Sequence, residues 1–119
     1  METVVLKKID SRGGKRFKRY NLKPEALLIG AIWEELGGIK AVAEKLNIPY
    51  QSIINFRIRG RVPLTQVFNI ATALDIPPWG LNYKQLKTMY PNVPEWKQVV
   101  KSYKLEPHVT ARILGLKTP

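Results

Sequence analysis

Two side-chain amides and three guanidinium groups occur close together near the middle of this 119-residue chain. Gln51 and Asn55 are four residues apart, so on a helix they lie on one face. An amide offers a hydrogen-bond donor and an acceptor side by side, whereas a guanidinium group fits phosphate or carboxylate oxygens. The guanidinium groups follow at Arg57, Arg59 and Arg61. The chemistry of this segment is recognition through hydrogen bonds and charge.

Residues for covalent or metal chemistry do not form a catalytic set. The chain has no cysteine and a single histidine, His108, which excludes disulfides, thiolate catalysis and cysteine-based zinc sites. Glu34 and Glu35 are adjacent, so on a helix their carboxylates point apart. The segment 13–15 (Gly-Gly-Lys) lacks the glycine spacing and the hydroxyl residue of a phosphate loop. We therefore expect no enzyme activity, no catalytic residues, no cofactor and no metal.

Positive charge dominates the chain and is unevenly distributed. There are 20 Lys and Arg residues against 9 Asp and Glu residues, for a net charge of +11. Residues 1–23 carry +6, residues 37–63 carry +4 and residues 83–119 carry +5, whereas residues 24–36 carry −3 and residues 64–82 carry −1. This alternation indicates that some faces meet a polyanion and others do not.

Length and hydropathy favour one folded domain with an appendage. A length of 119 residues with 45% hydrophobic residues suffices for one modest core. No apolar run approaches the roughly 18 residues of a membrane span, and no signal-peptide pattern follows Met1. We expect a soluble cytoplasmic protein with no membrane partner.

The segment 1–23 has an apolar part followed by a basic part. β-branched residues and a Gly13-Gly14 turn favour a β-hairpin, while the basic composition equally fits an arm that becomes ordered on a partner. A solvated terminus is the third interpretation. The residues of this arm that would contact a polyanion are Arg12, Lys15, Arg16, Lys18 and Arg19.

The rest of the chain has helical spacing, so the predicted fold class is mainly α. Apolar residues recur every three or four positions and predict helices from Pro24 to about residue 36, then over 39–46, 49–59 and 64–74. In the last of these, one apolar stripe is predicted from Leu64, Val67, Phe68, Ala71 and Leu74. Together these helices define a domain over residues 24–82.

A helical C-terminal extension is predicted for residues 83–119. Asn82 with Gln85, and Asn92 with Glu95, have the spacing of a capping box and predict helices near 83–90 and 94–104. A last helix is predicted from Pro107 to Gly115. The extension could serve dimerisation or an extra DNA contact, or simply pack on its own domain, through the aromatic residues Trp79, Tyr83, Tyr90, Trp96 and Tyr103.

A steric pattern in residues 39–63 indicates two helices crossing at a tight turn. Ala43 is small where the helices approach, Asn47 lies at the turn, and Ile53 and Phe56 are apolar anchors of the second helix. This segment resembles the helix-turn-helix of the lambda-repressor-like family of phage and bacterial regulators, the Cro proteins and repressors.

The residues at the end of the second helix and just after it strengthen the resemblance. Residues 55–63, NFRIRGRVP, resemble the common family pattern N-W-x-x-R-G-R-V-P. The resemblance covers roughly residues 24–82, about half of the chain. The sequence departs from the family at Asn47, where Gly is commonest, at Phe56, where Trp is common, and at Ile54 and Ile58, which are apolar on the helix that would face DNA.

The resemblance implies a fold and a function. The fold would be a lambda-repressor-like helix-turn-helix bundle of about five short helices, with the basic arm or hairpin before it and the helical extension after it. The function would be that of a sequence-specific, double-stranded DNA-binding regulator, a repressor or Cro-like protein of a bacterial cell or its phage. Helix 49–59 would read the major groove, and a homodimer would bind a near-palindromic site.

The same resemblance assigns contacts to individual residues. An amide can pair with adenine N6 and N7, and an Ile methyl group can meet a thymine methyl. The predicted base contacts are Tyr50, Gln51, Ile54 and Asn55, and the predicted phosphate contacts are Ser52, Arg57, Arg59, Arg61 and Lys40.

Other interpretations stay open at these positions. Gln51 and Asn55 could be merely solvated, Tyr50 could pack on the turn, and Ile54 and Ile58 could be core or dimer-interface residues. The chain as a whole could be a protein-interaction module on the same fold, such as an antitoxin or a phage protein that binds RNA polymerase. It could also be a sequence-tolerant nucleic-acid binder, RNA included.

Overall fold

Residues 23–116, the part that the computed structural model describes, form seven helices joined by short loops. In chain order these are α2 (Pro24–Glu35), α3 (Ile39–Leu46), α4 (Tyr50–Arg59), α5 (Leu64–Leu74), α6 (Tyr83–Met89), α7 (Trp96–Lys101) and α8 (Pro107–Leu114). No strand occurs among these residues, so the mainly helical prediction is confirmed for them. Except for Lys23, the predicted arm or hairpin lies outside the described residues, including Arg12, Lys15, Arg16, Lys18 and Arg19.

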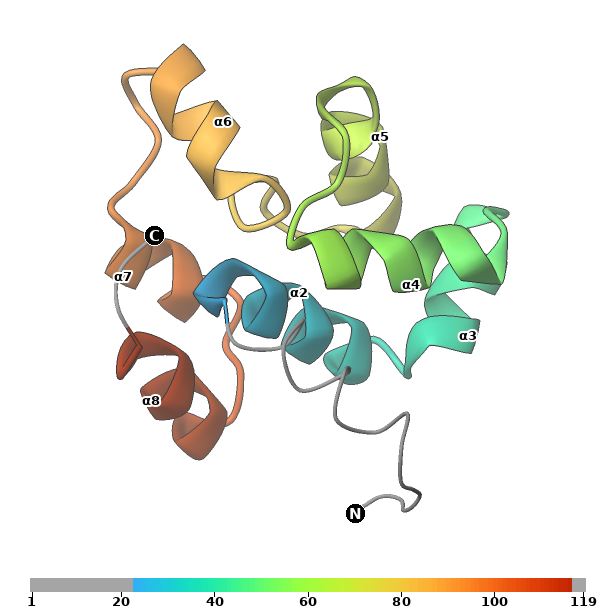
Figure 1. Ribbon diagram of the computed structural model, residues 1–119, viewed down its shortest axis with the longest axis horizontal. Helices are drawn as coiled ribbons and strands as arrows, with labels where there is room; N and C mark the ends of the chain where they lie inside the picture. Colours follow the sequence, from blue (N-terminus) through green and yellow to red (C-terminus); the bar gives the residue numbers. More distant parts are fainter. Residues whose placement is uncertain (1–22, 117–119) are drawn as a thin grey trace, which may run out of the picture.

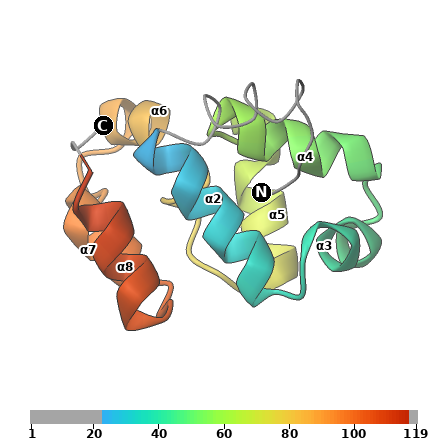
Figure 2. The same ribbon diagram turned by 60° about the horizontal axis from the view of Figure 1, so that its bottom comes forward.

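α2 lies at the centre, with α3, α4 and α5 on one side and α7 and α8 on the other (Figures 1 and 2). Pro24 begins α2, where its missing N–H costs nothing. Leu28, Ile29, Ile32 and Trp33 are all buried, because a helix that is apolar over most of its circumference needs partners on two sides. α2 has 12 residues, and no helix in the described part of the chain is long and apolar enough to cross a bilayer.

The C-terminal extension shares one core with the helices that precede it. Leu86, Trp96, Val99 and Ile113 belong to the same cluster of buried residues as Leu28 of α2. α8 packs against α2, and α7 packs against α8. The extension is therefore fastened to α2, on the side away from α3 and α4 (Figure 2).

Asn82 links the loop after α4 to the start of α6. Its side chain is buried, and its Nδ2 donates hydrogen bonds to the Val62 carbonyl at 2.9 Å and to Gln85 Oε1 at 2.6 Å. The helix predicted after Asn82 is present, but its side chain makes no capping bond to the backbone. The predicted capping box is wrong here because the amide satisfies a buried carbonyl of a distant segment instead.

The second predicted capping box is also wrong. α7 begins at Trp96 with Glu95 in the N-cap position, and Asn92 is exposed in the preceding loop. Val93 is buried, and its carbonyl accepts a hydrogen bond from Lys87 Nζ at 3.0 Å. This bond fixes the loop at Val93, and the chain is still extended at Glu95, so α7 begins later than the helix predicted over 94–104. It also ends earlier, at Lys101.

One residue of the stripe predicted for α5 faces outward. Val67, Ala71 and Leu74 are buried, as predicted, but Phe68 is 42% exposed. Helical spacing places Phe68 next to Val67 at the edge of the stripe, and no other described segment covers that edge completely.

Tyr103 closes the loop between α5 and α6 onto the extension. Its Oη donates to the Pro77 carbonyl at 2.5 Å and accepts from the Gly80 N–H at 2.8 Å. Gly80 permits this approach, because a Cβ there would lie 2.6 Å from the Tyr103 ring. Burial raises the pKa of the Tyr103 hydroxyl well above its usual value, and the hydrogen bond from Gly80 opposes that rise only in part.

The substitution Tyr103→Phe should destabilise the fold at neutral pH by about 1–3 kcal/mol, because the buried Gly80 N–H loses its acceptor. Since the pKa of Tyr103 is higher in the folded state than the usual 10.0, its contribution is complete below pH 10. Above pH 10 the wild type should lose up to about 1.4 kcal/mol per pH unit through this group, and the variant should not. Urea unfolding at several pH values measures both effects.

Tyr50→Phe is the matched control, because Tyr50 is 52% exposed on α4. That variant should have the stability of the wild type at neutral pH, and it should lose stability above pH 10 as the wild type does. Equal stability of the Tyr103→Phe variant and the wild type at neutral pH would contradict the role given to these hydrogen bonds.

Candidate nucleic-acid interface

α3 and α4 meet at the tight turn that the sequence predicts. Asn47 ends α3 in the left-handed region, with φ 55° and ψ 44°, a conformation that Asn adopts at lower cost than most residues. Ala43 is 7% exposed on α3, and Ile53 and Phe56 are 0% and 5% exposed on α4. The small residue, the turn residue and the two anchors therefore all lie where the steric pattern places them.

The anchors turn the polar side of α4 outward. Gln51 is exposed and Asn55 is half-exposed, and Gln51 Nε2 donates a hydrogen bond to Asn55 Oδ1 at 3.2 Å. This bond uses one of the two Gln51 N–H groups. The Gln51 oxygen and the Asn55 amino group can still bind a ligand. The two amides thus form one row on the surface, held in a common orientation.

Other predicted contact residues surround this row. Tyr50 begins α4 and is 52% exposed, so about half of its surface is open to a partner. Tyr50 and Lys40 of α3 line the same shallow groove, together with Asn47 and Pro49. Ser52 is half-exposed on the adjacent side of α4.

The two unusual isoleucines of α4 are not core residues. Ile54 and Ile58 are half-buried, as Arg57 is, but neither belongs to the hydrophobic core of the described residues or packs against it. By helical period both lie on the same half of α4 as Gln51. The core interpretation of these two residues is thereby wrong, while a base contact and a dimer contact both stay open.

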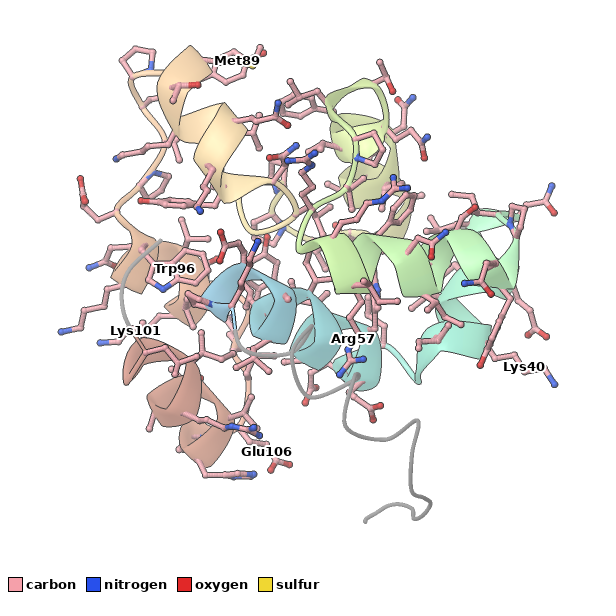
Figure 3. All side chains as sticks on the ribbon, viewed as in Figure 1. Lys40, Arg57, Met89, Trp96, Lys101 and Glu106 are labelled. Carbon is pink, nitrogen blue, oxygen red and sulfur yellow. The ribbon has the colours of Figure 1, made fainter. Side chains whose placement is uncertain are left out.

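The three arginines do not form one cluster. Arg59 and Arg61 are exposed at the end of α4 and just beyond it. Arg57 is half-buried and lies across α2, where its Nε is 2.6 Å from the position of a Cβ on Gly30 (Figure 3). Residues two apart on a helix point to opposite flanks, so Arg57 faces α2 while Arg59 faces away from it.

A cavity beside Arg57 was not indicated by the sequence. It has a volume of about 580 Å³ and lies between α2 and α8. Its lining includes Trp33, Glu34, Arg57 and Arg112, and Trp33 Nε1 is buried without a hydrogen-bond partner among the described residues. Gly30, in the apolar middle of α2, is the one sequence signal that a side chain crosses this helix here.

The turn itself gives a test of this geometry. Asn47→Gly should change the free energy of unfolding by less than about 1 kcal/mol, because Gly adopts the left-handed conformation freely. Asn47→Val should cost about 1–2 kcal/mol more than Asn47→Gly, because a β-branched residue is strained at φ 55°. Urea unfolding of the two variants measures the difference, and equal stabilities would contradict the left-handed turn.

No protein-family model, curated protein or solved structure matches this chain. What the α3–α4 surface binds must therefore be inferred from its own side chains. These are two aligned amides on an exposed helix face, two exposed arginines at the end of that helix and just beyond it, a tyrosine in its first turn and a lysine beside that turn.

Proposed function

We propose that the protein is a sequence-specific, double-stranded DNA-binding regulator of the lambda-repressor-like kind, a repressor or Cro-like switch. It acts as a homodimer in the cytoplasm of a bacterial cell, and α4 is its reading helix. The proposal rests above all on one observation, the hydrogen-bonded pair of Gln51 and Asn55 on the exposed face of a helix whose opposite face is buried.

The chemistry of this pair matches base edges in the major groove. Adenine presents an acceptor at N7 and a donor at N6, and a Gln or Asn amide can satisfy both at once. The bond between Gln51 and Asn55 supports this use, because it reduces the side-chain freedom that would be lost on binding. Ile54 lies beside the pair on the helix, where a thymine methyl group is the apolar partner that a groove offers.

The surroundings of α4 leave room for a duplex. α7 and α8 pack on the far side of α2, so no described part of the extension covers the face with Gln51 (Figures 1 and 2). The exposed basic side chains of Lys40, Arg59 and Arg61 lie around this helix. Basic side chains in such positions bind phosphates and fix the register of the protein on the duplex without reading its sequence. Arg57 would join them by turning away from Gly30.

The proposed homodimer follows from the size of the reading surface. One helix contacts too few base pairs for selectivity among the many sites of a genome. Two copies related by a two-fold axis would present their α4 helices about 34 Å apart, one turn of the duplex, on a near-palindromic site.

Selection of bound duplexes from a random pool tests the proposal as a whole. A regulator of this kind enriches one motif with two half-sites about 10 base pairs apart, centre to centre. A sequence-tolerant binder retains duplexes or RNA without enrichment and loses affinity uniformly as salt rises. A protein-interaction module retains no nucleic acid.

Replacing either amide by alanine should weaken binding to the selected duplex by about 1–3 kcal/mol and leave random duplex binding unchanged. The variants are Gln51→Ala and Asn55→Ala, and Gln98→Ala, on the exposed surface of α7, is the matched control. Titration by fluorescence anisotropy gives the affinities. If both amide variants keep the full site preference, α4 does not read the duplex with this row.

Replacing Arg59 or Arg61 by alanine should weaken selected and random duplexes alike. Each substitution should lower the slope of log affinity against log salt by about 1, because one phosphate contact is lost. Lys101→Ala on α7 is the control, since that side chain is exposed on the far side of α2 from α4 and should leave the slope unchanged (Figure 3). An altered site preference in the Arg59 or Arg61 variant would overturn the phosphate role.

A further inference from the structure

Three aromatic side chains from separate segments meet at the surface, and we call them the aromatic cluster. The ring of Phe68 on α5 lies 6.4 Å from that of Trp79 and 6.1 Å from that of Tyr90, edge to face in both pairs. The rings of Trp79 and Tyr90 are 6.4 Å apart. Each ring lies next to the other two, so exposed Phe68 and Tyr90 belong to one packed cluster, in which Trp79 also packs against the core.

The cluster is the largest concentration of exposed apolar side chains among the described residues. Phe68 is 42% exposed and Tyr90 is 37% exposed, and Met89, next to Tyr90 in the chain, is 53% exposed. The other aromatic residues of the extension pack inward, as with the rings of Tyr83 and Trp96, which lie 5.0 Å apart in the core. Exposed apolar patches of this kind in soluble proteins mark interaction sites.

The charges around the cluster decide which partner it suits. Residues 64–82 contain no Lys or Arg and only one acid, Asp75, in a chain with a net charge of +11. Residues 88–94, which include Tyr90, contain no charged residue. The lysines between these two ranges, Lys84 and Lys87 on α6, form ion pairs with Glu25 and Glu95 at 3.1 Å. A duplex would require Lys or Arg side chains that are available to its phosphates, and neither range supplies one. Association with a second copy of this chain instead favours a patch without such side chains. Two chains that each carry a net charge of +11 repel each other wherever their Lys and Arg side chains face each other.

From this combination we infer that the aromatic cluster is the surface through which two copies of the chain associate. Phe68, Trp79 and Tyr90 are the anchors, and the same patch of each copy meets that of the other across a two-fold axis. The inference rests on the proposed function for its need of two copies, and it names the surface that joins them.

The position of the cluster is compatible with a reading helix on each copy. Met89, beside the cluster, and Lys40, beside the first turn of α4, lie at opposite sides of the molecule in Figure 3. A second copy bound at the cluster therefore leaves the beginning of α4, with Tyr50 and Gln51, uncovered.

Sedimentation of the full chain over a range of protein concentrations tests the inference. The wild type should reach twice the monomer mass of 13.6 kDa. Phe68→Lys and Phe68→Glu should each raise the dimer dissociation constant at least about 30-fold, because each buries a charge at an anchor position of an apolar interface. Gln98→Lys is the control with the same added charge, on exposed α7, and it should sediment like the wild type.

A positive and a negative charge at position 68 together separate the effect of charge repulsion from that of aromatic contact. If reduced repulsion alone governed association, Phe68→Glu would strengthen the dimer of a basic chain, and that result would overturn an interface built on aromatic contact. A wild type that stays monomeric at every concentration, or a Gln98→Lys variant that dissociates equally, would overturn it too.

Tryptophan fluorescence gives a second measurement on the unaltered chain. Trp33 and Trp96 are 1% and 4% exposed, whereas Trp79 is half-exposed and is therefore the tryptophan that acrylamide reaches. Quenching should fall as the protein concentration rises through the association range, and constant quenching would contradict the inference. A dimer of this kind without duplex selectivity would remove the proposed function alone. A selective dimer that the Phe68→Lys and Phe68→Glu substitutions leave intact would remove this inference alone.

Discussion

The direction in which α4 presents its side chains depends on the burial of two residues, Ile53 and Phe56. A helix turns by about 100° per residue, so once these two side chains face the core, Gln51 and Asn55 must face away from it. Asn47, in the left-handed conformation, sets the angle at which the chain enters α4. The exposed row of amides is thus a consequence of core packing, and any change that rotated the anchors would rotate the row with them.

Charge divides the surface into regions with different uses. In the described part of the chain, most Lys and Arg residues lie around α4 and on the extension, while residues 64–82, which contain Phe68 and Trp79, have none. Shared apolar packing holds the extension on α2, so it lies away from the exposed face of α4. The Asn82 amide ties the start of α6 to the loop after α4, and the Tyr103 hydroxyl ties the extension to the loop between α5 and α6. One body therefore presents a polar reading face and a separate, uncharged aromatic face.

Features set by neighbouring residues could be predicted from the sequence, and features set by distant segments could not. The ends of α3 and α4 depend on turn chemistry and apolar spacing, which a sequence carries locally, and the outward direction of Gln51 and Asn55 follows from that spacing. Asn92 fails as a cap because a buried loop residue holds the chain extended, and Phe68 is exposed because no other segment covers it completely. Arg57 crosses α2 only because Gly30 leaves space, which depends on the packing of two helices.

The amide resonances of the side chains give the most direct test that α4 reads DNA. In a nitrogen–proton correlation spectrum of the isotope-labelled protein, the side-chain NH₂ signals of Gln51 and Asn55 are observed individually. Addition of the selected duplex should shift both pairs of signals, and a random duplex at the same salt concentration should leave them nearly in place. Unchanged Gln51 and Asn55 signals, with shifts confined to α7 and α8 on the selected duplex, would contradict a reading role for α4.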